Sequence, residues 1–417
     1  MLRRLLCSNS TARRTLSTVD TLEPPLLVAP ESRARLGALQ RFIRSELLPL
    51  EAEAAAAAAL TDGNRTPPQL LRELRRKVAR RSAALGFFGM TQPASFGGAP
   101  ASQIEILLCR EALAAANLPK LGTAVFGPGA GLLGTATGKL RERYLQPLLS
   151  GEIHGSFGFT EPADATERTK AVRDGDELVV TGVKSYVTGG DTADFVAALC
   201  SLREADGAKA GTALVVVPLD SPGVTVERVF RSMDPDTPGH AYVVFREARV
   251  PAWSVVGKSG GRGGMESAMR QIGSVRLMLS AEAVGTTAWA LTHARERLGR
   301  PHRSGTPLAE RDHVKLRLGE LHAQAFAARC VLYRTAQLLE SGEPAKAELI
   351  ACKLVCTETA GRVVDGCVQL CGGTAVVVGD PLEAAYKRAR QWRFAEGESD
   401  VLRMKLGEQA LAGEARL

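Results

Sequence analysis

Hydrophobic positions recur at helical spacing through the first third of the chain. Residues 33–51 place one apolar stripe along a predicted helix, formed by Leu36, Leu39, Phe42, Ile43 and Leu47. A second helix is expected to open at Pro67 and Pro68, and a third to cover residues 102–115 with Ser102 as its N-cap. This spacing predicts an all-α domain over residues 28–155.

The second predicted helix has two unlike sides. One side is apolar, and the other carries six basic residues: Arg72, Arg75, Arg76, Lys77, Arg80 and Arg81. Runs of charge on a helix usually face water. We therefore interpret the basic side as solvent-exposed helix surface in preference to a ligand-binding patch.

The pattern changes near residue 156 to short runs rich in β-branched residues. Turn signals such as Asp174-Gly175-Asp176 separate these runs, as expected between strands. The predicted strands cover residues 177–183, 195–201, 212–218, 223–230 and 241–246. Residues 156–256 are accordingly predicted to form a middle β-domain, folded as a small barrel.

Helical periodicity returns after a glycine-rich break at residues 257–264. Four segments are long enough for bundle helices, and they cover residues 265–298, 308–341, 344–371 and 381–394. We expect residues 257–417 to form a C-terminal four-helix bundle. The predicted fold class is α+β, with a helical domain, a β-domain and a helical bundle in that order.

Composition narrows the choice of ligands and partners. The chain has 417 residues and a formal net charge of +8. No apolar run reaches the roughly 20 residues that span a bilayer, so we expect no integral membrane segment. The basic residues are not interleaved with aromatic ones, which argues against a nucleic-acid partner. The eight cysteines form no Cys-x-x-Cys pair and have no neighbouring histidine, so we predict reduced thiols and no metal.

The two ends of the chain resemble targeting signals. Residues 1–20 contain four arginines, several hydroxyl residues and no acidic residue before Asp20, which is typical of a mitochondrial transit peptide. The chain ends in Ala415-Arg416-Leu417, a variant of a peroxisomal address. We predict the mitochondrial matrix, with the peroxisome as the alternative.

Several short motifs occur in a fixed order along the chain. They are Leu85-Gly86-Phe87, Phe159-Thr160-Glu161-Pro162, Thr181-Gly182-Val183-Lys184, Arg249-Val250-Pro251, Gln369-Leu370-Cys371-Gly372-Gly373 and Ala395-Glu396-Gly397. Each motif is weak alone, but together they resemble the acyl-CoA dehydrogenase family over almost the whole chain after about residue 30. The details most resemble the subgroup of long-chain-type members with a kinase-like domain fused in front. That subgroup has Asp at the position that Glu396 holds here.

The resemblance implies a catalytic base and a substrate site. Glu396 on its Glu-Gly turn would remove the proton next to a thioester carbonyl, and burial should raise its pKa toward that task. Arg276 and Gly397 would help to bind the acyl-CoA. Without the resemblance, Glu396 would be an ordinary glutamate at a helix end.

The resemblance also implies FAD as the cofactor. Eight residues match positions that contact it: Phe159, Thr160, Tyr186, Thr188, Gln369, Gly372, Gly373 and Arg300. Thr188 would lie near flavin N5, and Tyr186 replaces the usual tryptophan beside the ring. Gln369, Gly372 and Gly373 would face the FAD of a neighbouring subunit, so a homodimer or homotetramer is expected. Either Arg300 or Arg303 would replace the family arginine that grips that FAD.

The predicted reaction is dehydrogenation of an acyl-CoA to a trans-2-enoyl-CoA, in fatty-acid or branched-chain oxidation. Electrons would pass to electron-transfer flavoprotein. Two alternatives stay open: a peroxisomal acyl-CoA oxidase on the same fold, and a non-catalytic relative acting as a binding or assembly subunit. The loop Ala163-Asp164-Ala165-Thr166 lacks the family glycines, which motivates the non-catalytic alternative. The presence of Glu396 argues against it.

Overall fold

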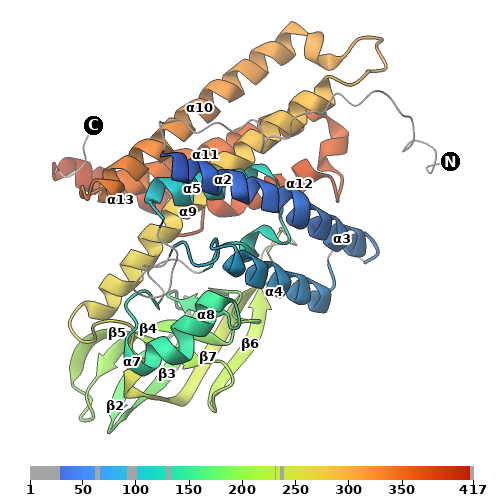
Figure 1. Cartoon of the computed structure of the whole chain (residues 1–417). Coiled ribbons are helices and arrows are strands. Elements are labelled where there is room, and N and C mark those ends of the chain that lie inside the picture. Colours follow the sequence, from blue (N-terminus) through green and yellow to red (C-terminus); the bar gives the residue numbers. More distant parts are fainter. Residues whose placement is uncertain are drawn as a thin grey trace.

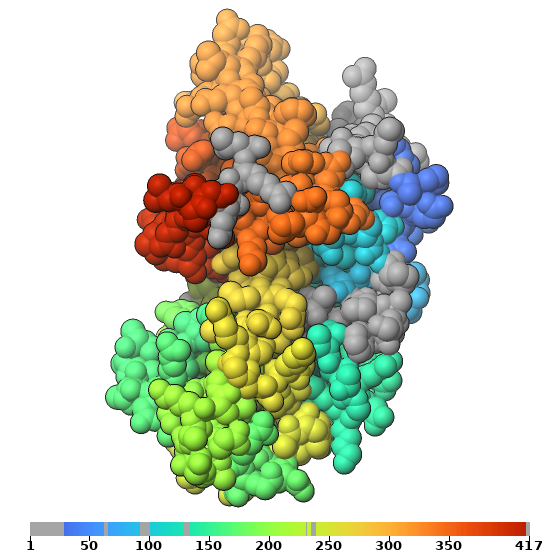
Figure 2. All heavy atoms as spheres, turned by 90° about the vertical axis from the view of Figure 1, so that its left-hand side faces the viewer, coloured from blue at the N-terminus to red at the C-terminus, as the bar shows by residue number. Residues whose placement is uncertain are grey.

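The computed structural model describes residues 29–61, 66–91, 101–127, 133–230, 232–234 and 239–413. The predicted transit peptide and the C-terminal tripeptide lie outside these residues. Figure 1 shows two helical layers stacked above a β-domain, with one long helix running between the two halves. Figure 2 shows the same two lobes in space-filling form.

The N-terminal domain is helical, as its apolar spacing predicts. Its helices are α2 (Pro30–Phe42), α3 (Leu48–Ala59), α4 (Pro68–Ala84), α5 (Gln103–Ala115), α7 (Gly138–Leu140) and α8 (Gln146–Ser150), with π-helical turns at Ile43–Leu47 and Arg141–Leu145. Ser102 caps α5 as predicted: its Oγ accepts from the Glu105 N–H, and Glu105 accepts from the Ser102 N–H. Leu39, Phe42 and Ile43 lie in the core of this domain.

The β-domain is one seven-stranded sheet. Its strands are β1 (Gly155–Gly158), β2 (Lys170–Asp174), β3 (Glu177–Thr188), β4 (Phe195–Arg203), β5 (Lys209–Pro218), β6 (Val224–Phe230) and β7 (His240–Pro251). The strand order is β1-β4-β2-β3-β7-β6, and β5 pairs with β4. Within the described residues these pairings form an open path rather than the closed barrel that we expected.

Two strands were missing from the sequence prediction. β1 and β2 are only four and five residues long, and both pair in parallel with β4. Short strands carry too few alternating positions to be detected from pattern alone. Their positions matter because the loop between them holds Phe159, Thr160 and Glu161.

The C-terminal domain consists of α9 (Gly263–Leu298), α10 (Asp312–Glu340), α11 (Lys346–Cys371), α12 (Pro381–Trp392) and α13 (Ser399–Leu411). The first four correspond to the predicted bundle helices, and α13 is an addition. One apolar core joins α9, α10, α11 and α12 to α5 of the N-terminal domain. Helix α9 also packs against β5, so it links the bundle to the β-domain (Figure 1).

A buried charge cluster fixes α5 to α10. The Glu111 side chain is fully buried, and its carboxylate accepts a hydrogen bond from Arg329 Nε at 2.6 Å and another from the Tyr333 hydroxyl. Burial raises the pKa of Glu111, while Arg329 and Tyr333 oppose that rise. The cluster ties the N-terminal domain to the bundle through a satisfied polar contact.

Candidate active site

Glu396 lies in the turn between α12 and α13. Its backbone has a φ of +57°, a left-handed conformation that is uncommon for a residue with a side chain. Gly397 follows with a φ of +116°, which strongly favours glycine. The pair turns the chain sharply and leaves the Glu396 side chain half-buried. Strain at such a turn is a reason to suspect function.

Two cationic side chains from the bundle bind the backbone of this turn. Arg276 on α9 donates from Nε to the Glu396 carbonyl oxygen at 2.8 Å. Lys353 on α11 donates from Nζ to the Gly397 carbonyl oxygen at 2.8 Å and to the Arg393 carbonyl oxygen at 3.3 Å. Both residues come from long bundle helices, so the turn is anchored to α9 and α11.

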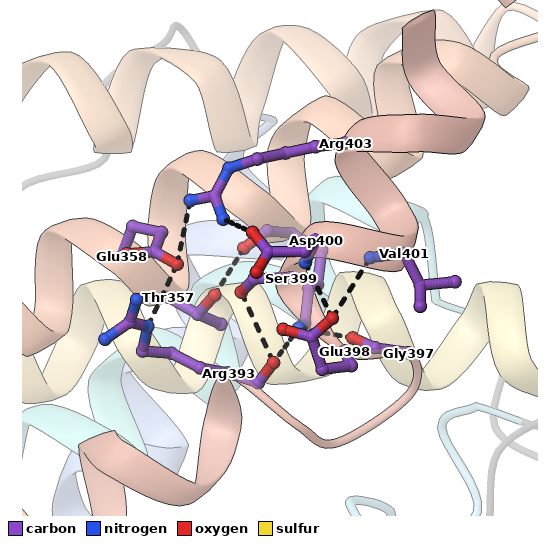
Figure 3. Close-up of polar contacts among 10 residues, drawn as sticks. Thr357, Glu358, Arg393, Gly397, Glu398, Ser399, Asp400, Val401 and Arg403 are labelled. Carbon is purple, nitrogen blue, oxygen red and sulfur yellow. Dashed lines mark hydrogen bonds and ion pairs between the residues drawn. The ribbon is translucent and has the colours of Figure 1, made fainter. Parts of the chain in front are cut away.

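A second layer of polar contacts surrounds the turn (Figure 3). The Glu358 carboxylate accepts from Arg393 Nε at 2.9 Å and pairs with Arg403 at 3.1 Å. Glu398 caps α13 by accepting from the Asp400 and Val401 N–H groups at 2.8 and 3.1 Å. These contacts fix both ends of the segment that carries Glu396.

The charges around Glu396 adjust its proton affinity in opposite directions. Burial raises the pKa of Glu396 to about 7, while the positive charges of Arg276 and Lys353 oppose the rise. Burial, together with the smaller effect of the Arg276 charge, lowers the pKa of Lys353 to about 8. A carboxylate with a pKa near 7 matches the requirement for a general base at neutral pH.

The backbone beside the carboxylate offers a hydrogen-bond donor. Within the described part of the chain, the Glu396 N–H has no acceptor, although the Glu396 carbonyl is held by Arg276. A base and a free N–H on one residue can act together on a carbonyl compound: the N–H binds the carbonyl oxygen and the carboxylate takes the neighbouring proton. The turn thus provides the two groups that an α-proton abstraction needs.

The predicted flavin contacts on the β-domain lie close together. The Ser185 N–H donates to the Thr160 carbonyl at 2.9 Å, which sets Thr160 beside Tyr186 on β3. Thr188 Oγ1 is 3.1 Å from His240 Nδ1. The Tyr186 ring is 61% exposed and stacks on Phe230, with ring centroids 5.4 Å apart. An exposed aromatic ring and two exposed hydroxyl groups therefore line the end of β3.

A buried lysine positions the loop after β1. Lys184 is only 1% exposed, and its Nζ donates to Glu161 Oε1 at 2.9 Å and to the Phe159 carbonyl at 3.2 Å. Glu161 Oε1 also accepts from the Thr169 N–H at 2.8 Å. Burial alone would raise the pKa of Glu161, but these contacts keep it below its ordinary value. Phe159 and Thr160 are therefore held on a firmly anchored loop.

The other predicted cofactor residues lie on the bundle, in a second group. Gln369, Gly372 and Gly373 are exposed at the end of α11, and no atom lies within 4 Å of a Cβ built on either glycine. Arg300 is exposed after α9. Nearby, Arg297 pairs with Asp380 at 2.8 Å. The two groups sit on different domains of one chain.

Three features of the site were missed by sequence reasoning. Lys353 and Lys184 are buried lysines that hold the Glu396 turn and the loop after β1, respectively. The only sign of them in the sequence is a lysine within an apolar run. The basic side of α4 was interpreted as solvated surface. Five of its six residues are exposed as predicted, but Arg72, Arg75 and Arg76 also line a cavity of about 850 Å³ that reaches Thr188 on β3.

The structure combines a helical domain, a β-domain and a helical bundle that carries a half-buried glutamate on a left-handed turn. The described residues contain no helix long and apolar enough to cross a membrane and no cluster of metal-ligating side chains. The acyl-CoA dehydrogenase family models match nearly the whole chain: the N-terminal domain at residues 29–152, the middle domain at 156–248 and the C-terminal domain at 262–411. The chain therefore belongs to the acyl-CoA dehydrogenase family, whose members are oxidoreductases acting on acyl-CoA.

Individual relatives are distant. The chain is 26% identical over 341 residues to the mitochondrial isobutyryl-CoA dehydrogenase of Dictyostelium discoideum, covering 80% of this chain and 81% of the relative. A crystal structure of a probable acyl-CoA dehydrogenase from Mycobacterium abscessus matches with a TM-score of 0.80 and 28% identity, covering 92% of this chain and 99% of that one.

A glutaryl-CoA dehydrogenase from Mycobacterium smegmatis, solved in complex with FADH2, shares the fold. Its TM-score is 0.80 at 19% identity, covering 97% of this chain and 100% of that one. The closer likeness to the kinase-fused subgroup stays a prediction.

Proposed function

We propose that this protein is an FAD-dependent acyl-CoA dehydrogenase that converts an acyl-CoA to a trans-2-enoyl-CoA. The observation that carries the proposal is the Glu396 turn. It combines a carboxylate whose pKa burial raises to about 7 with an adjacent free N–H and two cationic anchors. A relative that only binds acyl-CoA has no need for a base at this pKa.

The chain's own residues perform the proton transfer. The Glu396 N–H donates to the thioester carbonyl oxygen, which makes the α-hydrogen more acidic. The Glu396 carboxylate then accepts the α-proton. Arg276 and Lys353 keep the turn in place, and their charges oppose the rise in the pKa of Glu396, so that part of the carboxyl groups stay ionised at neutral pH. Gly397 gives the backbone its reversal.

The β-domain and the bundle would share the cofactor. Phe159, Thr160, Tyr186 and Thr188 would hold the flavin ring, because they present an aromatic ring and hydroxyl groups on one anchored edge of the sheet. When bound, FAD accepts the β-hydrogen of the substrate as hydride.

The bundle group fits the remainder of the cofactor. Gln369, Gly372, Gly373 and Arg300 would contact the FAD of a neighbouring subunit, and the open space above both glycines lets a ligand approach the backbone. Val376, Val377 and Val378 beside them are 63%, 58% and 65% exposed. Such an apolar run supports a homo-oligomer that covers it.

Electron-transfer flavoprotein is the electron acceptor in this proposal. The mitochondrial matrix is the proposed compartment, supported by the arginine-rich and acid-poor composition of residues 1–20. The oxidase alternative uses the same base and differs only in the electron acceptor.

The test is an anaerobic absorption titration of the purified protein with acyl-CoAs of graded chain length. We expect a flavin spectrum that bleaches with at least one of them. Glu396→Gln should retain the flavin spectrum but lose bleaching, while Glu408→Gln, which removes an exposed carboxylate on α13, should bleach like the wild type. Equal bleaching by wild type and Glu396→Gln would refute the role of Glu396. A wild-type flavin that none of the acyl-CoAs bleaches would refute the proposed dehydrogenase activity.

A further inference from the structure

The cavity beside α4 has a basic wall. It has a volume of about 850 Å³ and lies between α4 and the β-domain. Arg72, Arg75 and Arg76 form part of its lining, and Thr188 on β3 lines it as well. Residues three and four apart share one side of a helix, so all three guanidinium groups approach the same space.

Two of these arginines lack a counter-ion. Within the described residues, Arg72 and Arg76 are exposed and form no ion pair. Arg81 on the same helix, by contrast, is paired with Glu46 at 2.9 Å. Arg75 is half-buried, and its Nε donates to the Lys120 carbonyl at 2.9 Å, which fixes it at the cavity wall.

The other charged residues of the lining are fewer than the arginines. Asp191 and Asp234 line the cavity too. Asp191 lies against Gly239, just before β7; burial lowers the pKa of the adjacent His240, and the charge of Asp191 opposes that shift. Burial lowers the pKa of His154; the charge of Asp194 opposes this shift, and those of Arg76 and Arg75 add to it. Among the lining residues the three arginines outnumber the two aspartates, so the lining carries a net positive charge.

The rest of the lining is suited to a hydrocarbon chain. Leu71, Phe88 and Phe126 also line the cavity. Thr188 marks the flavin edge in the proposed function, so the substrate β-carbon has to come close to it. A chain that continues from there into the cavity would pass the apolar side chains and end among the arginines.

We propose that this cavity receives the distal end of the substrate's acyl chain and that this end carries an oxyanion, either a carboxylate or a phosphate ester. Guanidinium groups bind both through paired N–H donors, which is a stronger contact than a neutral hydrogen bond. This inference rests on the proposed function and adds the substrate class to it.

The first test compares three substrates of equal chain length: octanoyl-CoA, octanedioyl-CoA and 8-phosphooxyoctanoyl-CoA. The Arg72→Met/Arg76→Met variant is compared with Arg80→Met, which removes an exposed arginine on α4 that is not part of the cavity lining. In the wild type we expect kcat/KM to be higher for one of the anionic substrates than for octanoyl-CoA. The double variant should lose about tenfold or more on that substrate, and about nothing on octanoyl-CoA.

The anionic substrates also identify the oxyanion. A preference for octanedioyl-CoA identifies a carboxylate, and a preference for 8-phosphooxyoctanoyl-CoA identifies a phosphate. Equal kcat/KM values for all three substrates, with no effect of the double variant, would overturn the inference while leaving the proposed function intact.

A second test does not depend on turnover. Octanedioate and inorganic phosphate are titrated calorimetrically into the purified protein. We expect binding by the wild type and Arg80→Met, and loss of that binding in Arg72→Met/Arg76→Met. If this binding pattern is found and none of the acyl-CoAs bleaches the flavin, the proposed dehydrogenase activity is refuted but the oxyanion site is retained. Binding that survives the double substitution would refute the site.

Discussion

The candidate base should destabilise the protein in a pH-dependent way. Glu396 must bury a carboxylate, and burial raises its pKa from the ordinary 4.5 to about 7. A group whose pKa is raised by folding adds stability below its unfolded pKa, and this stability is lost as the pH rises through the folded pKa. Glu396→Gln removes the titration and keeps nearly the same shape.

The size of the effect follows from the two pKa values. Each pKa unit corresponds to about 1.4 kcal/mol, so a rise from 4.5 to about 7 costs the charged form about 3 kcal/mol. The penalty is absent below pH 4.5, grows between pH 4.5 and 7, and is complete above pH 7. Relative to the wild type, Glu396→Gln should therefore gain about 3 kcal/mol of unfolding free energy on going from acid to alkaline pH.

The assay is urea denaturation of wild type, Glu396→Gln and Glu408→Gln at several values between about pH 5 and pH 8. Any constant effect of the amide cancels, because only the change with pH is compared. Glu408→Gln controls for the loss of one negative charge at the surface of α13. Parallel pH dependences for wild type and Glu396→Gln would refute the claim that Glu396 is a buried base with a raised pKa.

Two further substitutions test the anchors of the turn. Lys353→Met removes a positive charge that lowers the pKa of Glu396, so the acid limb of the pH–rate profile should move upward by about one pH unit; an unmoved limb would contradict that coupling. Gly397→Ala should cost about 1–3 kcal/mol of unfolding free energy and slow turnover, because a Cβ at a φ of +116° would lie 2.9 Å from Leu402 Cδ2. Gly305→Ala, at a φ of +90° with no atom within 4 Å, separates backbone strain from this clash.

Much of the fold could be predicted because its signals are local. Apolar spacing predicted most helices of both helical domains, though not α13, and β-branched runs located five of the strands. The open sheet could not be predicted, since strand order depends on pairings such as β2 with β4 that join residues far apart in the sequence. A local sequence pattern can predict that a segment forms a strand, but it does not predict which strand that segment pairs with.

The site was only partly predictable for a similar reason. Glu396 and Gly397 were identified through their resemblance to a family motif. Lys353 was missed because the two carbonyl oxygens that it binds, at Arg393 and Gly397, are 40 and 44 positions away in the sequence. The exposure of the basic side of α4 was predicted, but a single helix cannot show that three of its arginines also line a cavity shared with the β-domain.

The energetics of the Glu396 turn argue against a relative that has lost its activity. Glu396 has a left-handed backbone, which costs a residue with a side chain about 1–2 kcal/mol. Its carboxylate is buried at a further cost, and Lys353 is 0% exposed with its pKa lowered to about 8. A glycine or asparagine at position 396 would relieve the backbone strain, and a neutral side chain would remove the free-energy cost of burying a charge. Since each relief needs one substitution and none is present, the turn is better explained by the proton transfer that we propose for it than by the stability of the bundle.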